Sequence, residues 1–477
     1  MTIYWLLSIC SFMATSVNTL DPELRPLLYV AVVAFMAPLF GFNLGFIVAF
    51  KTQLINLFML EPYDIDTLIG TFVLGTMVGG FFGGWLNYSS GRKISIIAGV
   101  VLGLSGESTC LLAPDFSLLL LSEFVVGAAL GIYLLSSIIY VCEISSPAKR
   151  SVSGVLIAVC LIAGVLFVTV TREILPSSAV VMAVALIVYE AFFLVIALLK
   201  MPESPRWLAL SGLSDAALSV LLRLRGDSGK SARELALINE CCHGEDRGID
   251  FFIHSEHYRK VIWFLVLITL LMQLAGFSLI PYVFLQIVHE NHVSFIEAAS
   301  AGYDYDYGLV KSAVTVGLFG AICSAFALNR LGNRSVIIYG VVIALFSLIL
   351  LFFLTFFELK GLKSLFLGSF LLIFIFGVTV AYTAFITSFA TEVLPERGRD
   401  LGLAVVMVVN FVSFLSVMQS FELLTSMWHI SGCFGFCLLS TLVLLCFLYK
   451  SLPETSEYSL EEIEQRIFRG GGMGGLH

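Results

Sequence analysis

Long apolar stretches, separated by short polar ones, recur along the whole chain. A helix that crosses a bilayer needs about 20 predominantly apolar residues. Twelve stretches reach that length, at residues 27–51, 65–87, 94–114, 116–141, 151–171, 177–200, 260–286, 307–329, 335–357, 364–390, 400–424 and 428–450. The pattern therefore predicts twelve membrane-spanning helices.

One long polar stretch, residues 201–259, divides these spans into six and six. Leu, Ala, Arg and Glu recur in it at helical spacing, which predicts short amphipathic helices beneath the membrane domain. The role of residues 4–18 is left open. We expect an N-terminal segment at 1–26, a six-helix bundle at 27–200, a cytoplasmic linker with short helices at 201–259, a second six-helix bundle at 260–450 and a cytoplasmic tail at 451–477.

Composition supports an all-α integral membrane protein. Hydrophobic residues make up 59% of the chain and charged residues 13%, with a mean hydropathy of +0.99, so a soluble fold would expose apolar surface everywhere. The chain has no nucleotide-binding loop, no metal motif and no nucleophile paired with a base. We therefore expect no enzyme activity, no catalytic or metal-binding residue and no cofactor. No basic tract is long enough to bind nucleic acid.

Lys and Arg predict the orientation. The loops after spans 2, 4, 6, 8 and 10 and the central segment carry most of them, and cytoplasmic loops are enriched in Lys and Arg. Both termini are therefore expected in the cytoplasm. We expect a multi-pass protein of the plasma membrane that acts as a monomer, with the lipid bilayer and a small-molecule solute as its partners.

The two halves also repeat each other. "SSGRKISIIAG" follows span 2 and "RLGNRSVIIYG" follows span 8, while "CEISSPAKRS" ends span 4 and "TEVLPERGRD" ends span 10. Glu143 precedes Arg150 by seven residues, as Glu392 precedes Arg399. Matching charges at matching places indicate a duplicated bundle. Alternating-access carriers are built in this way, with the solute site near the midplane between the repeats.

These motifs resemble a known family. "GRK" after span 2, "PESPRWL" after span 6 and "PETSEYSLEEI" after span 12 resemble the sugar-porter branch of the major facilitator superfamily, over nearly the whole chain. The resemblance implies twelve transmembrane helices in two six-helix bundles. It also implies that Glu203 and Glu454 bind basic residues of the short cytoplasmic loops and lock the bundles together on the inside. The expected charge network is Arg92, Glu143, Arg150, Glu203, Arg206, Arg334, Glu392, Arg399 and Glu454. The alternative is that these charges only anchor loops at the membrane interface.

The resemblance also suggests solute ligands, but the pattern has changed. Met272 takes the place of the first of two glutamines in the seventh span, and Thr379 and Thr387 take the places of a Glu and a Trp in the tenth. The candidate solute-binding residues are Asn43, Gln273, Ser278, Tyr282, Thr379, Thr387 and Asn410. The alternative is a polar side chain satisfied by neighbouring helices, and it applies to Gln273, Ser278, Thr379, Thr387 and Asn410. For Gln273 we favour a functional role.

Most partners for the hydroxyls of a hexose are therefore missing, and an unpaired buried polar group costs roughly 1–3 kcal/mol. A sugar remains the leading substrate class. A non-sugar organic solute is the alternative, and a sensor that uses the fold without transporting ranks last.

Asn43 bears on energy coupling. Proton-coupled members of the family usually have an Asp at this place, and an amide cannot exchange a proton near neutral pH. Asn43 therefore predicts a facilitative uniporter. Glu123 lies within an apolar span where the family ordinarily has an Arg, and an ionisable residue there is a functional candidate. Glu107 and Glu190 are similar cases.

Overall fold

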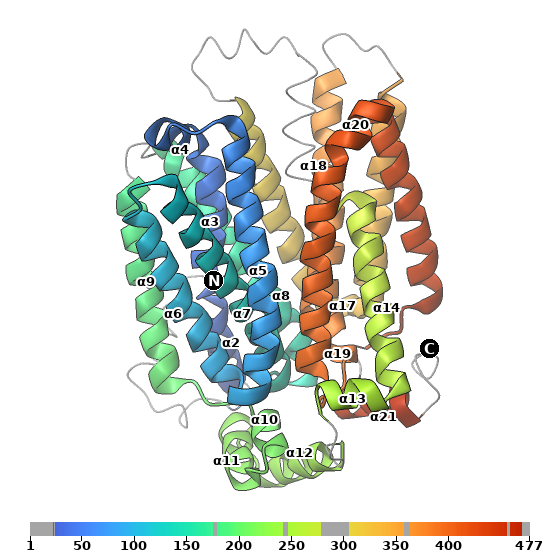
Figure 1. Ribbon diagram of the computed structural model, residues 1–477. Helices are drawn as coiled ribbons and strands as arrows, with labels where there is room; N and C mark the ends of the chain where they lie inside the picture. The colour runs from blue at the N-terminus through green and yellow to red at the C-terminus, as the bar shows by residue number, and fades with distance from the viewer. Residues whose placement is uncertain are drawn as a thin grey trace.

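The computed structural model describes residues 22, 24–174, 179–241, 247–277, 305–356, 363–455 and 458–469. Within these ranges the regular secondary structure is helical, with no strand. Figure 1 shows two bundles of long helices side by side, with several short helices at one end. We call that end of the molecule the linker end.

Five long helices and one broken helix form the first bundle. The first span is divided at Phe35 and Met36, where a turn precedes Pro38, because proline cannot donate the hydrogen bond that would continue the helix. The elements are α2 (Leu24–Ala34), α3 (Ala37–Ala49), α5 (Pro62–Ser90), α6 (Arg92–Leu111), α7 (Phe116–Ile144), α8 (Pro147–Ile174) and α9 (Ala179–Lys200). The short helix α4 (Lys51–Phe58) lies at the end opposite the linker end (Figure 1).

The second bundle contains longer helices than the hydrophobic pattern predicts. The boundary expected between spans 8 and 9 is a bend at Gly332 within one helix. Spans 11 and 12 also lie within one helix, and no proline or glycine interrupts it at residues 403–431. The elements are α14 (Glu256–Met272), the π-helical turn η2 (Gln273–Phe277), α17 (Tyr305–Leu354), α18 (Lys363–Ala384), η3 (Phe385–Phe389), α19 (Ala390–Val393) and α20 (Arg399–Ser451).

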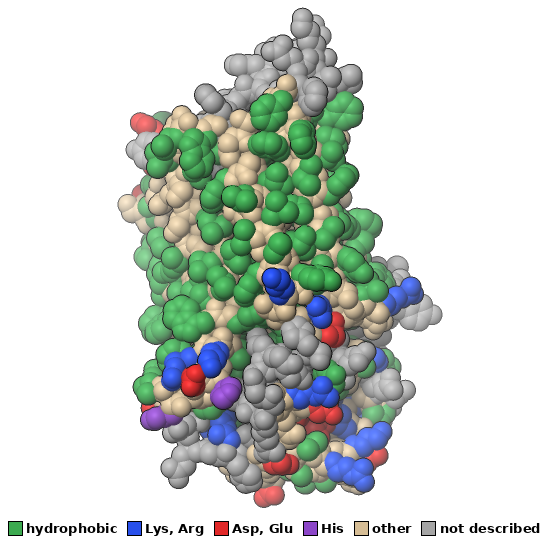
Figure 2. Space-filling model, turned by 90° about the vertical axis from the view of Figure 1, so that its right-hand side faces the viewer, with side chains coloured by type: hydrophobic (Ala, Val, Ile, Leu, Met, Phe, Trp, Pro, Cys, Tyr) green, Lys and Arg blue, Asp and Glu red, His purple; other side chains and the backbone are tan. Residues whose placement is uncertain are grey.

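The helices account for twelve spans. Eleven segments among the described residues are long and apolar enough to cross a membrane, and the one at Val310–Leu354 is 45 residues long. The bend at Gly332 divides that segment into two, which makes twelve. An apolar surface covers most of the face shown in Figure 2, whereas charged side chains gather toward the linker end.

The linker and the tail lie together under the bundles. Ser204 accepts hydrogen bonds from the first backbone N–H groups of α10, which explains why a helix begins inside "PESPRWL". The short elements are α10 (Pro205–Leu210), α11 (Ser214–Arg225), α12 (Ser228–Cys241), α13 (Ile249–His254) and the tail helix α21 (Leu460–Arg469). Figure 1 shows α21 close to α13, at the linker end of the second bundle.

Candidate functional site

A buried ion pair joins α6 to α7 at the linker end. The Arg92 guanidinium binds the Glu143 carboxylate with two parallel hydrogen bonds of 3.0 Å each, and both side chains are 1% exposed. Bidentate pairs of this geometry are strong and directional. This contact lies within the first bundle.

Three further ion pairs cross from one bundle to the other. Arg399 Nη1 lies 3.4 Å from Glu143 Oε1, and Arg150 Nε lies 3.2 Å from Glu392 Oε1. Arg92 Nη2 also lies 3.1 Å from the carboxylate of Asp400. The predicted charges of both halves therefore meet in one buried cluster. We call Arg92, Glu143, Arg150, Glu392, Arg399 and Asp400 the linker-end charge cluster.

Asp400 was missed by the sequence analysis. It directly follows Arg399 at the start of α20, and a carboxylate beside a predicted network arginine was the available signal. Its side chain is 13% exposed and reaches across the bundle boundary to Arg92.

Glu203 and Glu454 make different contacts from those expected. Glu203 Oε1 accepts hydrogen bonds from the backbone N–H groups of Arg92 (2.9 Å) and Lys93 (3.1 Å), at the start of α6. Carboxylates at helix N-termini satisfy free N–H groups and the helix dipole. Burial raises the pKa of Glu203, and the hydrogen bonds from the backbone and the charge of Arg92 oppose that rise.

Glu454 repeats this arrangement in the second half. It accepts from the backbone N–H groups of Asn333 (3.0 Å) and Arg334 (3.1 Å), just after the bend in α17. Each glutamate thus holds a helix start within its own bundle. The ion pairs that join the bundles involve Glu143 and Glu392, which belong to the expected network, and Asp400.

Two glycines make these contacts possible. Gly91 and Gly332 have φ values of +93° and +78°, which side-chain-bearing residues rarely adopt. A Cβ at Gly91 would lie 2.5 Å from the Glu203 carboxylate, and one at Gly332 would lie 2.6 Å from that of Glu454.

Arg206 connects three segments. Its guanidinium forms ion pairs with Glu396, between α19 and α20, and with Glu461 on α21. Burial opposes the charge on Arg206, but the carboxylates of Glu461, Glu234 and Glu143 together raise its pKa. Burial likewise opposes the ionisation of Glu461, but the charge of Arg206 lowers its pKa. Arg334 donates to the backbone carbonyl of Tyr449, so it stays within the second bundle.

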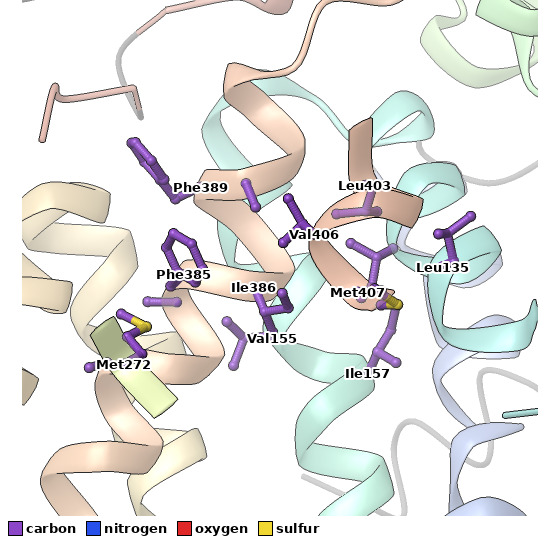
Figure 3. Packing of buried hydrophobic residues seen from close by; sticks show 14 of the residues in the cluster. Leu135, Val155, Ile157, Met272, Phe385, Ile386, Phe389, Leu403, Val406 and Met407 are labelled. Atoms are coloured by element: carbon purple, nitrogen blue, oxygen red, sulfur yellow. The ribbon is translucent and has the colours of Figure 1, made fainter. Parts of the chain in front are cut away.

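Apolar side chains of the two bundles pack against each other (Figure 3). Val155 and Ile157 of α8 point toward Ile386 of η3 and Met407 of α20, and all four belong to one buried cluster. The backbone also approaches closely, because a Cβ at Gly154 would clash with the carbonyl oxygen of Thr387. This packing and the charge cluster hold the bundles together.

Two of the candidate solute ligands meet in the second bundle. Gln273 Nε2 donates to Asn410 Oδ1 over 2.6 Å, and both side chains are buried. Among the described residues, Gln273 Oε1 has no hydrogen-bond partner. Tyr382 of α18 interacts with the Asn410 amide. The turn η2 and α20 thus present an amide pair with one free acceptor.

The other candidates are placed differently. The hydroxyls of Thr379 and Thr387 each donate to a carbonyl one turn back in their own helix. Ser278 and Tyr282 lie outside the described residues.

Asn43 and Glu123 lie in the first bundle rather than beside Gln273. Asn43 Nδ2 donates to Glu107 Oε1 of α6 over 2.8 Å, and the electrostatic neighbours of Glu123 are Glu107, Asn43 and Cys110. Glu107 was noticed in the sequence only as an intramembrane carboxyl. The fold gives it a partner.

Among the described residues no group of His, Cys, Asp and Glu is arranged to hold a metal ion.

A family model described as "Sugar (and other) transporter" matches residues 29–467. The galactose-proton symporter of Escherichia coli is 25% identical over 438 residues, which cover 91% of this chain and 92% of the symporter. The major myo-inositol transporter IolT of Bacillus subtilis is also 25% identical, with 86% of each chain covered.

Solved structures show the same fold. A proton:xylose symporter of the major facilitator superfamily, XylE, bound to 6-bromo-6-deoxy-D-glucose, gives a TM-score of 0.77 at 16% identity and covers 91% of this chain and 98% of its own. The inward open conformation of XylE from E. coli gives 0.62 at 17% identity, with coverage of 91% and 98%.

Proposed function

We propose that this chain, which belongs to the sugar (and other) transporter family, moves a small polyhydroxylated solute across a membrane by alternating access. The family model covers nearly the whole chain, and the solved structures share its fold. The predicted family, the twelve-helix major facilitator fold and the multi-pass membrane location are therefore confirmed. The chain is a transporter and not an enzyme.

The amide pair of Gln273 and Asn410 carries the proposal of a sugar. A buried amide oxygen without a donor is unfavourable, and a solute hydroxyl would supply that donor. Relatives are named for galactose, arabinose, myo-inositol and polyols, all of which present several hydroxyls. A sugar is the leading class, and a polyol is the non-sugar alternative that these names favour.

Ion pairs between the bundles at the linker end support alternating access. The pairs Arg399–Glu143, Arg150–Glu392 and Arg92–Asp400 join the bundles at the linker end, so opening that end must break them. A two-state carrier needs such differential contacts. We take the linker end to be cytoplasmic, with both termini there, because the basic loops lie on that side. Location in the plasma membrane and function as a monomer stay predictions.

The test is uptake by the purified full chain in liposomes. We expect one or more of labelled D-galactose, L-arabinose and myo-inositol to enter and to exchange, whereas labelled organic ions do not. Gln273→Ala should weaken binding of the transported solute. Thr269→Val is the matched control, because Thr269 is equally buried one turn earlier and donates only to the carbonyl of Leu265 in its own helix.

Equal affinity in Gln273→Ala and the wild type would remove Gln273 from the solute site. Absence of uptake for every hydroxylated solute would favour the sensor alternative.

The mode of transport is the finer question. Uniport, which the amide of Asn43 predicts, assumes that no neighbouring carboxyl exchanges a proton. Glu107 and Glu123 lie beside Asn43 and make that assumption testable.

A further inference from the structure

Three polar side chains from three helices meet inside the first bundle. They are Asn43 of α3, Glu107 of α6 and Glu123 of α7, which are 3%, 5% and 1% exposed. Glu107 lies four residues before the end of α6 and Glu123 seven residues after the start of α7, so both lie toward the end opposite the linker end. We call Glu107 and Glu123 the carboxyl pair.

The hydrogen bonds of this group are incomplete. Asn43 Nδ2 donates to Glu107 Oε1 over 2.8 Å, and the Cys110 thiol, a weak donor, lies 3.9 Å from Glu123 Oε1. Within the described part of the chain, Glu123 Oε2 and Asn43 Oδ1 have no hydrogen-bond partner. All the orphaned atoms are acceptors. A proton on Glu123 would turn one of them into a donor, and buried polar groups are normally satisfied.

Among the residues that the structure describes, no cation neighbours the carboxyl pair. Asn43 and Glu107 are the neighbours of Glu123 together with Cys110, and the neighbour of Glu107 is Asn43. The described part of α3 carries no ionisable residue, and the carboxyls of α5, Asp64 and Asp66, lie in its first turns.

Two further carboxyls of the first bundle have other surroundings. Glu190 of α9 lies beside Tyr133 and Tyr189, and Glu173 at the end of α8 pairs with Lys311. Two buried carboxylates without a counter-charge repel each other, and a low-dielectric site favours one shared proton.

We propose that the Glu107–Glu123 pair binds a proton that crosses the membrane with the solute. The inference rests on the proposed function as a transporter and replaces the uniport prediction made from Asn43 alone. A carboxylate oxygen takes the proton from water on one side and returns it to water on the other. No other bond forms or breaks.

The packing links the carboxyl pair to the moving interface. Asn43 ties α3 to Glu107, and α3 touches α8 backbone to backbone, because a Cβ at Gly41 would clash with the Leu161 carbonyl oxygen. The helix α8 in turn packs against η3 of the second bundle at Gly154. A change at the pair can therefore reach the contact that opens and closes, and coupling requires such a difference between states.

The first experiment measures accumulation of labelled D-galactose, L-arabinose and myo-inositol by the full chain in liposomes. An inward proton gradient of one pH unit should drive up to about tenfold accumulation for one proton per solute. A protonophore should abolish it. In Glu107→Gln and Glu123→Gln the ratio of accumulation to solute exchange should fall toward the value without a gradient. Glu190→Gln is the matched control, because it removes an equally buried carboxyl outside the pair and should retain accumulation.

Several outcomes would overturn the proposal. They are exchange without gradient-driven accumulation in the wild type, accumulation driven by sodium instead of protons, and full accumulation in both glutamine variants. Loss of accumulation in Glu190→Gln alone would also overturn it. Absence of both uptake and exchange in the wild type would instead contradict the proposed function.

A second measurement needs no solute. The infrared difference spectrum of the reconstituted protein between acidic and alkaline pH should contain the C=O band of a buried protonated carboxyl. That band should lose intensity in Glu123→Gln and in Glu107→Gln, and persist in Glu190→Gln. A spectrum that is unchanged in both pair variants would refute proton binding there.

Discussion

The two halves of the molecule carry the same motif at the linker end with one chemical difference. In the first half Arg92 follows Gly91 and binds Glu143; in the second, Asn333 follows Gly332 and donates to Glu392 over 2.9 Å. An amide replaces a guanidinium, so the internal partner of Glu392 is neutral. The helix-capping glutamates, by contrast, are retained in both halves.

Both halves have the ion pair between the bundles, whereas the ion pair within the bundle is present only in the first half. Glu143 pairs with Arg399 of the second half, and Glu392 pairs with Arg150 of the first. Each glutamate thus binds the arginine that follows the other one in sequence. The comparison indicates that the reciprocal pairs, rather than the contacts within each bundle, define the closed linker end.

The largest effect is expected for Glu143→Gln. It leaves the guanidiniums of Arg92 and Arg399, each 1% exposed, without their shared carboxylate. Breaking a buried pair in this way costs about 3–5 kcal/mol. The free energy of unfolding should fall by that amount. Spin labels on Lys93→Cys and Lys450→Cys should also show a wider linker end.

The matched control is Glu256→Gln, whose exposed pair with Lys260 is expected to contribute about 0–1 kcal/mol. Similar unfolding of both variants would show that the pairs of Glu143 contribute little.

Glu392→Gln should have a smaller effect, because it leaves a single guanidinium, that of Arg150, without its carboxylate. Ser151 and Ser388 both donate to Glu392 Oε1, and they can still donate to a glutamine oxygen in that position. We expect a loss of about 1–3 kcal/mol, measured by the same unfolding and distance experiments. A loss as large as that of Glu143→Gln would contradict the difference between the halves.

The capping sites should respond equally. Gly91→Ala and Gly332→Ala each place a Cβ against a carboxylate at positive φ, and the backbone conformation alone costs roughly 1–2 kcal/mol. Both should lose at least that much in unfolding free energy. Gly212→Ala separates the cost of the backbone conformation from the cost of the contact with the carboxylate. Gly212 has φ +78°, but a Cβ there would have no atom within 4 Å. Unequal effects at Gly91 and Gly332 would argue against a common capping role.

The smallest effect concerns the tail helix α21. Burial raises the pKa of Glu464 to about 7, although Arg399 and Arg397 oppose the rise. The docked state therefore binds the proton more tightly than the free tail does. Docking should strengthen as pH falls through about 7 and be weakest at higher pH. Hydrogen exchange of α21 between about pH 6 and 8, corrected for intrinsic rates, would show this.

Glu464→Gln should remove that pH dependence, and the exposed Glu462→Gln should not. Equal pH dependence in the wild type and in Glu464→Gln would reject Glu464 as the titrating group.

Part of the site was predictable from sequence because repeats and charges can be recognised locally. The spacing of Glu143 from Arg150, and of Glu392 from Arg399, indicated two equivalent charge motifs. It could not indicate that each glutamate pairs with the other half's arginine. That choice depends on how two bundles pack, which no local pattern contains. Glu396 and Glu461 were missed for the same reason.

The sequence by itself determined the class of protein, the twelve spans and the two halves, because bilayer thickness imposes a length on every apolar helix. Only the tertiary structure decided that Glu203 and Glu454 cap helices within their own bundles. It also brought Asn43 to Glu107, sixty-four residues apart. Hydrogen bonds act over about 3 Å, and which residues come that close is set by helix packing rather than by separation along the chain.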